Sequence, residues 1–320
     1  MRVSIIVPTR NRPDTLAIAL QSIRQQTYEF LDIIVVDDAS DDFNAKSNIS
    51  VTSKFGEGVQ YFYLPAINGR PQGAACSRNF GVRNSCGDIV GFCDDDDYWL
   101  DGQHLEVVAN YLSENSEIDV IYANQLTAFE GSINSRVWQP DFVRHIKGRA
   151  RDINNIVRLT KAESMFSCDR FPHLNATLYR RRLFDLVGGF SENLTFYQDL
   201  DFFLRAVDSA SGLCYMDADV SVHNRPNRSR SSNLSSDLGS VERALWDADV
   251  TRRLAYTCHD PFVSDYARRL TATHLRDLSL LYVKNCEFDK AALAARTALA
   301  WRFSIKWLAY TSWLGLKAIN

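Results

Sequence analysis

Four consecutive aspartates, Asp94, Asp95, Asp96 and Asp97, directly follow the apolar residues 89–93. Like charges packed this closely cost free energy unless a positive charge compensates them. Carboxylate oxygens suit hard divalent cations, and Mg2+ in particular takes one or two carboxylates together with substrate phosphates. The run therefore predicts a site for Mg2+ or Mn2+. The alternative is a solvated acidic loop that caps the following helix.

A second acidic pair, Asp37 and Asp38, follows the apolar residues 33–36. In nucleotide-binding folds an acid at a strand end commonly accepts hydrogen bonds from a ribose or a base. The alternative is that Asp38 or Ser40 caps the next helix.

Asp199 stands at the start of a helix expected over residues 199–207. The helix dipole favours an ionised acid at this position. An ionised carboxylate placed beside an acceptor hydroxyl can act as a general base. Simple capping of the helix is an equally good interpretation of this segment alone.

Residues 73–79 (GAACSRN) open another expected helix with small side chains. Small residues let the backbone approach a ligand, and a helix N-terminus favours anions. Arg78 in this segment is suited to a phosphate or carboxylate partner. Tight packing of the helix on a sheet would also explain the small residues.

The elements that position these side chains alternate along the chain. Apolar runs predict strands over 3–7, 33–36, 59–64, 89–93, 118–122, 176–179 and 213–222, and apolar periodicity predicts helices over 13–26, 73–84, 101–112, 183–187 and 199–207. This alternation is typical of βαβ units and a mostly parallel sheet, whose ligands bind outside the carboxyl ends of the strands. The polar clusters around Thr9, Asp38 and Asp94 all follow strand ends. Residues 130–170 lack clear periodicity.

Composition is ordinary for a globular protein, with 320 residues, 46% hydrophobic and 23% charged. The net charge of -3 argues against a nucleic-acid partner. Seven irregularly spaced cysteines without a C-x-x-C pair indicate reduced thiols and a cytosolic compartment. We expect a catalytic domain over residues 1–225, a flexible Ser- and Arg-rich loop over 226–238 and a helical C-terminal region over 239–320.

Several segments, in order, resemble the family-2 glycosyltransferases of the GT-A fold over about residues 1–225. The matching segments are SIIVPTRNR (4–12), VDDAS (36–40), SRNFGV (77–82), GFCDDDDYW (91–99), GGFSE (188–192) and QDLDFFLR (198–205). The resemblance implies an α/β domain that transfers a sugar from a nucleotide-diphosphate donor, with a UDP-sugar favoured. Bacterial surface-polysaccharide synthesis is the usual setting of the family.

The resemblance also implies roles for individual residues. The donor would be bound by Pro8, Thr9 and Arg12 in the base pocket, Asp38 on the base with Asp37 beside it, Arg78 on the pocket or the phosphates, and Asp94 and Asp95 in the acidic run. Asp96 would be the direct metal ligand, with Asp94 on the metal or the ribose. Asp199 would be the catalytic base of an inverting enzyme.

Two departures from the family pattern stand out. Gln198 replaces the usual glutamate before the base, and His223-Asn224-Arg225 matches the end of the pattern poorly. His223 is a further candidate for the metal or a phosphate, although a lone histidine is more often structural. The departures keep a non-catalytic sugar-nucleotide-binding or scaffold protein open as an alternative. A nucleotidyltransferase is disfavoured, because the N-terminal region lacks a Gly-rich basic loop.

The C-terminal residues 301–317 (WRFSIKWLAYTSWLGLK) are aromatic and basic. On a continuous helix, Phe303, Trp307, Tyr310 and Leu314 would share one side. Tryptophan, tyrosine and basic residues favour the membrane interface. One hypothesis is therefore a cytoplasmic enzyme that docks on the inner leaflet, near a glycan or lipid-linked acceptor. The alternative is an amphipathic helix packed on its neighbours.

Overall fold

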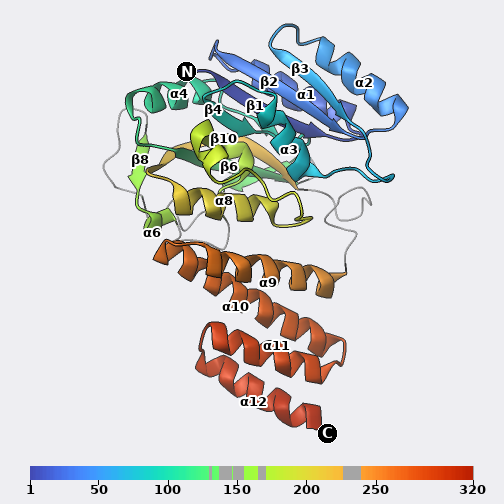
Figure 1. Cartoon of the computed structure of the whole chain (residues 1–320), viewed down its shortest axis with the longest axis vertical. Coiled ribbons are helices and arrows are strands. Elements are labelled where there is room, and N and C mark those ends of the chain that lie inside the picture. The colour runs from blue at the N-terminus through green and yellow to red at the C-terminus, as the bar shows by residue number, and fades with distance from the viewer. Residues whose placement is uncertain (130–131, 137–145, 147–154, 165–170, 226–238, 320) are drawn as a thin grey trace. The chain divides into compact units, whose positions relative to one another are not determined.

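The computed structural model describes the chain except for residues 130–131, 137–145, 147–154, 165–170, 226–238 and 320 (Figure 1). The chain divides into two compact units, Met1–Asn227 and Arg228–Asn320. The loop expected over residues 226–238 lies outside the described residues.

The first unit is an α/β unit built around one sheet. Its strands are β1 (Val3–Thr9), β2 (Leu31–Asp38), β3 (Val59–Leu64), β4 (Ile89–Phe92), β5 (Tyr98–Trp99), β6 (Val120–Phe129), β7 (Ser132–Arg136), β8 (Ile156–Leu159), β9 (Thr177–Arg180) and β10 (Leu213–Arg225). Its main helices are α1 (Pro13–Arg24), α2 (Asp42–Ser53), α3 (Ala74–Arg83), α4 (His104–Glu114), α7 (Arg181–Leu186) and α8 (Gln198–Ser209). The shorter α6 (Lys161–Ser164) follows β8.

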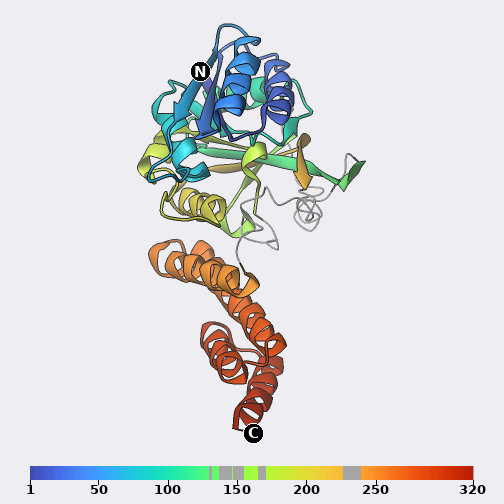
Figure 2. The ribbon, with the colours of Figure 1, turned by 90° about the vertical axis from the view of Figure 1, so that its right-hand side faces the viewer.

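The strand order in the sheet is β3-β2-β1-β4-β9-β6-β10-β5, with β7 paired to β6 and β8 paired to β10. Strands β3, β2, β1 and β4 form a parallel block, as the sequence predicts. The sheet becomes mixed beyond it, because β9 runs antiparallel to both β4 and β6. Strands β6 and β7 form a hairpin that projects from the rest of the unit (Figure 2).

Helices cover both faces of the parallel block. Alternate residues of β1, Val3, Ile5 and Val7, belong to a fully buried cluster that includes apolar residues of α1 and α4. Ile6 points to the other face, where α3 packs so closely that a Cβ on Gly81 would lie 2.5 Å from the Ile6 side chain. This tight approach explains a glycine inside α3 and fixes the helix over the ends of β1 and β2.

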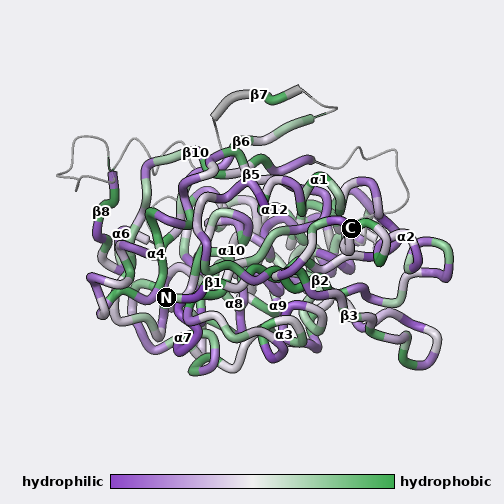
Figure 3. The backbone as a smooth tube through the Cα atoms, turned by 90° about the horizontal axis from the view of Figure 1, so that it is seen from above, coloured by the Kyte–Doolittle hydropathy of each residue, from purple (hydrophilic) through white to green (hydrophobic). Residues whose placement is uncertain are grey.

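The second unit consists of the helices α9 (Ser240–Thr257), α10 (Pro261–Lys284), α11 (Phe288–Trp301) and α12 (Ile305–Ile319). Each helix packs on the next one in the chain. Small residues of α11, among them Ala291 and Ala295, form a buried cluster with Leu314 of α12. Hydrophilic and hydrophobic residues are interspersed along the described chain (Figure 3), and no described helix is long and apolar enough to cross a membrane.

The C-terminal aromatic segment is not one continuous helix. Helix α11 ends at Trp301, Arg302 has an extended backbone, and α12 begins at Ile305. Trp307 and Tyr310, on the side that the sequence marks as a membrane face, pack against the buried cluster around Leu314. Trp307, Tyr310 and Leu314 of that side therefore pack within the second unit, whereas Phe303 precedes α12 and is 67% exposed.

Candidate active site

The predicted site residues gather at the carboxyl ends of β1, β2 and β4. Thr9 ends β1, Asp38 ends β2, and the four aspartates follow β4. Strand β1 lies between β2 and β4. The chain leaves β1 towards β2 and β3, and it then crosses back to form β4 on the other side of β1, so the strand order reverses there. In open α/β sheets such a switch point is where ligands bind.

The four aspartates alternate between open and buried positions. The exposed fraction of the side chain is 25% for Asp94 and 35% for Asp96, but 7% for Asp95 and 1% for Asp97. Asp94 and Asp96 therefore keep part of their carboxylates accessible, whereas Asp95 and Asp97 face the protein.

Two arginines compensate part of this negative charge. Arg78 pairs with Asp94 at 2.6 Å and lies over the ring of Phe190. Arg12 bridges Asp95 and Asp96 at 3.1 and 2.8 Å. Asp95 also accepts a hydrogen bond from the Thr9 hydroxyl at 2.7 Å.

These contacts place Asp95 behind the site, where it holds Thr9 and Arg12. Pro8 is buried within β1 and pairs with Val36 of β2, so it shapes the floor of the site.

The pKa values report how well each charge is balanced. Burial and the neighbouring Asp96 raise the pKa of Asp95 to about 7. Burial and Asp94 also raise the pKa of Asp96, although Arg12 opposes them. Burial acts to raise the pKa of Asp94 too, but Arg78, together with His173 and His223, outweighs burial and the pKa falls. The acidic run thus carries more negative charge than its arginines balance, which suits a divalent cation.

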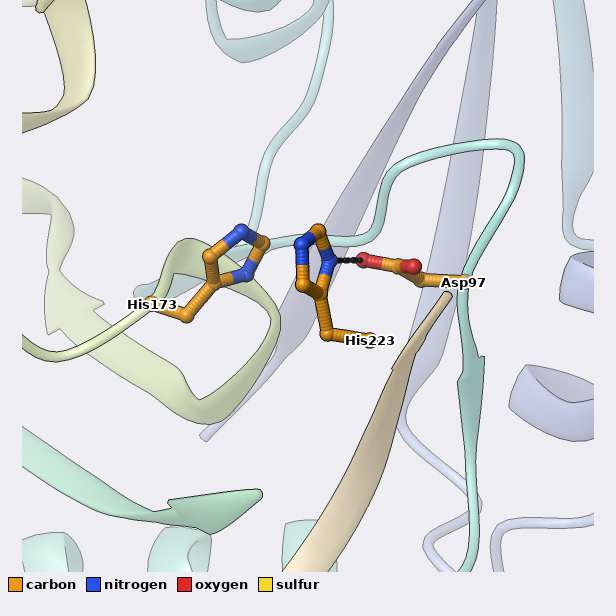
Figure 4. A group of neighbouring side chains, drawn as sticks. All are labelled: Asp97, His173 and His223. Atoms are coloured by element: carbon orange, nitrogen blue, oxygen red, sulfur yellow. Dashed lines mark hydrogen bonds and ion pairs between the residues drawn. The ribbon is translucent and has the colours of Figure 1, made fainter. Parts of the chain in front are cut away.

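Asp97, the last aspartate of the run, lies in a cluster with His223 of β10 and His173 (Figure 4). Its carboxylate accepts hydrogen bonds from His223 Nδ1 at 3.0 Å, from the backbone N–H of Asn224 at 2.8 Å and from the amide of Asn175. The ring of His223 lies between Asp97 and His173, with 4.6 Å between the two imidazole centroids.

Asp97, His173 and His223 lie close enough together to hold a metal ion. The three hydrogen bonds to Asp97 favour a different role for this carboxylate. When Nδ1 of His223 donates to Asp97, the lone pair of the neutral imidazole lies on Nε2, which is the tautomer that binds metals through Nε2. Burial lowers the pKa of His223, but the hydrogen bond and charge of Asp97, together with the charges of Asp94 and Asp96, outweigh burial and raise the pKa. We therefore assign Asp97 to orienting His223.

Asp37 and Asp38 have different surroundings. Asp37 is fully buried, and its carboxylate accepts hydrogen bonds from Ser40 N–H, Asn48 and the Tyr61 hydroxyl at 2.7–2.9 Å. Asp37 therefore belongs to the scaffold behind the site. The Asp38 carboxylate accepts from the N–H groups of Gln72 and Gly73, each at 2.7 Å.

Gly73 adopts φ +93°, a conformation that favours glycine, directly before α3. This conformation presents its N–H to Asp38. The two hydrogen bonds from Gln72 and Gly73 to Asp38 fix the loop before α3 against the end of β2.

Asp199 lies in the first turn of α8, after Tyr197, which has a left-handed backbone (φ +58°). Such backbone outliers concentrate at functional sites. Burial raises the pKa of Asp199, while the charge of Arg78 opposes this and Asp94 adds to it. The charges of Arg78 and Asp94, which form an ion pair in the acidic run, thus also act on Asp199.

Asp201, two residues further, is a structural acid. It is fully buried and pairs with Arg205 at 2.7 Å. Arg205 in turn donates to the carbonyl oxygens of Val187 and Gly189. This network anchors α8 to the segment after α7.

Three site residues, His173, Asn175 and Asn224, escaped the sequence interpretation. Asn175 accepts from the N–H of Asp94 at 3.0 Å and donates to Asp97. Asn224 donates its N–H to Asp97 and its amide to the carbonyl oxygen of Asp96 at 2.6 Å. Asn175 follows an irregular stretch and gives no local signal. Asn224 could have been noticed as the neighbour of His223.

Comparisons with known proteins agree with this geometry. The sequence matches Glycosyl transferase family 2 over residues 4–184. It is 38% identical over 133 residues to a Campylobacter jejuni GalNAc(5)-diNAcBac-PP-undecaprenol beta-1,3-glucosyltransferase, covering 42% of this chain and 41% of the relative.

Two solved structures share the fold. Staphylococcus aureus TarS 1-349 in complex with UDP-GlcNAc has a TM-score of 0.65 at 18% identity, covering 93% of this chain and 82% of that chain. The mannosyltransferase PcManGT from Pyrobaculum calidifontis, in complex with GDP-Man and Mn2+, has a TM-score of 0.62 at 18% identity, covering 100% and 81%. The first unit thus has the GT-A fold, and with the family match spanning more than half of its sequence, the chain belongs to glycosyltransferase family 2.

Proposed function

We propose that this glycosyltransferase moves a sugar from a nucleoside-diphosphate donor to an acceptor hydroxyl with inversion at the anomeric carbon. The observation that carries the proposal is that Arg78, which pairs with Asp94 of the acidic run, also acts by its charge on Asp199. A group able to take a proton therefore lies within electrostatic range of a cation able to bind a leaving phosphate. A sugar transfer needs both groups at one place.

The donor would lie across the ends of β1, β2 and β4. Asp38, held by two backbone N–H groups, is placed to accept hydrogen bonds from the N–H groups of a base. Arg12 and Arg78 supply positive charge for the diphosphate. UDP is the favoured nucleotide, and the solved relative TarS, in complex with UDP-GlcNAc, supports this choice.

The residues fit a divalent metal ion, Mn2+ or Mg2+. Asp96 and Asp94 have the exposed carboxylates of the run, and His223 is oriented by Asp97. The excess of carboxylate charge, visible in the raised pKa of Asp95 and Asp96, is what a cation would neutralise. When bound there, the ion would supply electrostatic stabilisation of the diphosphate leaving group. The complex of PcManGT with Mn2+ supports this assignment.

The reaction balances without a covalent enzyme intermediate. Asp199 takes the proton of the acceptor hydroxyl, and the acceptor oxygen forms a bond to the anomeric carbon. The bond from that carbon to the phosphate oxygen breaks on the opposite face, and its electron pair stays on the diphosphate. Arg78 stabilises the developing charge. The raised pKa of Asp199 makes it a stronger base than an ordinary aspartate.

The acceptor is proposed to be a cell-surface glycan or a lipid-linked saccharide. The name of the Campylobacter jejuni relative, which contains an undecaprenol-linked acceptor, supports this class.

A donor screen tests the proposal. The full chain is incubated with Mn2+ and the UDP, GDP or dTDP conjugates of common sugars, and the released nucleotide is measured. Release from a UDP-sugar should be fastest and should disappear in Asp96→Asn. Binding of a UDP-sugar by calorimetry, with no release in the presence of any glycan acceptor tried, would favour the non-catalytic binding protein.

A further inference from the structure

The outer face of α12 is apolar and exposed. Ile305, Leu308, Trp313 and Leu316 are 78%, 47%, 43% and 67% exposed. Their spacing of three, five and three residues places them on one side of a helix. We call these four residues the outer face of α12. It differs from the side that the sequence alone marks as a membrane face.

The opposite side of α12 packs against the other helices of the second unit. Leu314 is fully buried in the cluster with Ala291 and Ala295 of α11, and Trp307 packs against the same cluster. The guanidinium of Arg276 in α10 lies 5.4 Å from the centre of the Trp307 ring. The fold of the second unit therefore does not require apolar residues on the outer face.

The C-terminal part of the chain, which contains α12, is basic. Residues 290–320 contain five basic residues and no aspartate or glutamate. Because the whole chain carries -3, the first 289 residues carry -8. Arg302, Lys306 and Lys317, which precede or flank the outer face, are all exposed.

We propose that the outer face of α12 binds the surface of a bilayer that contains anionic lipids. Aliphatic residues with a tryptophan and flanking lysines on one helix form an interfacial helix, which lies in the plane of the membrane. No described helix is long and apolar enough to span a bilayer, which agrees with binding in the plane. A second copy of the same face is disfavoured, because it would bring the basic side chains of two molecules together.

This inference does not depend on the proposed function, and its test needs no substrate. The full chain is mixed with vesicles of phosphatidylcholine alone or of phosphatidylcholine with phosphatidylglycerol, and bound protein is measured by flotation. We expect binding to the anionic vesicles and little to the neutral ones. Ile305→Glu with Leu308→Glu should lower the partition coefficient at least about tenfold, since two aliphatic side chains leave the interface.

The charge contribution is measured separately. Lys306→Gln with Lys317→Gln should weaken binding to the anionic vesicles about fivefold for each lysine. A matched control replaces one isoleucine and one leucine that are exposed in the first unit, Ile18 and Leu186, by glutamate. This control should float like the unchanged protein. Circular dichroism verifies that each variant keeps its helix content.

Three results would overturn the proposal. One is the absence of flotation with anionic vesicles, and another is equal binding to neutral and anionic vesicles. The third is binding that survives Ile305→Glu with Leu308→Glu. A dimer in sedimentation velocity that these two substitutions dissociate would assign the outer face to a second copy instead.

Discussion

Replacing Asp97 by asparagine separates the orientation of His223 from the rest of the site. Three donors point at the Asp97 carboxylate, from His223, Asn224 and Asn175. Asparagine keeps the shape but offers one acceptor oxygen and an NH2 group. At least one of the three donors must therefore face another donor, and the negative charge beside His223 disappears.

This substitution should change the pKa of His223, the affinity for the metal ion and the stability of the fold. Burial continues to lower the pKa of His223 and the charges of Asp94 and Asp96 continue to raise it, but both contributions of Asp97 are lost, so the pKa should fall from its raised value. Loss of a carboxylate that orients a metal-binding histidine typically weakens metal affinity about 10–100-fold, or about 1.4–2.7 kcal/mol. A buried donor left without an acceptor costs stability by about 1–3 kcal/mol.

Calorimetric titration with Mn2+ measures the affinity, and NMR titration of the histidine ring measures the pKa. Asp119→Asn is the matched control, because Asp119 is also buried and accepts hydrogen bonds from Arg182 and Ser211. It lies at the amino end of β6, on the opposite edge of the sheet. The control should lose stability but keep its Mn2+ affinity. Unchanged Mn2+ affinity in Asp97→Asn, together with a lowered His223 pKa, would refute the idea that His223 holds the metal.

Three further predictions concern the neighbouring acids. Asp96→Asn should abolish transfer, and excess chelator should do the same to the unchanged protein; full activity in chelator would exclude a metal-dependent reaction. Asp199→Asn should lower kcat about 10²–10⁴-fold while the calorimetric affinity for the donor persists, since a general base acts on the acceptor. Loss of donor binding in this variant would make Asp199 a donor ligand or a structural cap. The folded chain holds a proton on Asp95 between its ordinary pKa of 3.8 and about 7, where the unfolded chain releases it. The free energy of unfolding should therefore decline as pH rises through this window, and chemical denaturation should find a shallower decline in Asp95→Asn; equal slopes would contradict the raised pKa.

The parallel block was predictable because its strands are short apolar runs. Residues 59–64 are predicted and observed as β3, and the runs 3–7 and 33–36 are the centres of β1 and β2. Helix α2 was not predicted. Its sequence, DFNAKSNISVTS, is polar and rich in residues with weak helix propensity. Its stability comes from the N-cap residue Asp41, whose side chain accepts from Asn44 N–H, and from buried Asn48, which donates to Asp37. Both are tertiary or capping effects that apolar periodicity does not reveal.

The sequence predicts where the site lies better than it predicts the role of each residue in it. Strand ends place Asp38 and Asp94 at one edge of the sheet, whatever the details. Adjacent aspartates cannot be told apart by type, and only the alternation of exposure separates Asp96 from Asp97. Asn175 was out of reach, because its role depends on a contact with Asp97 across 78 positions of the sequence.

Gln198 shows how a departure from the family pattern can agree with the chemistry. Its side-chain oxygen is buried and has no hydrogen-bond partner among the described residues. A glutamate there would add a second buried negative charge next to Asp199, whose pKa burial and Asp94 already raise. Asp199 would then hold its proton to a still higher pH and serve less well as a base near neutrality. The neutral amide avoids this repulsion, so in the proposed mechanism the base function falls on Asp199 alone.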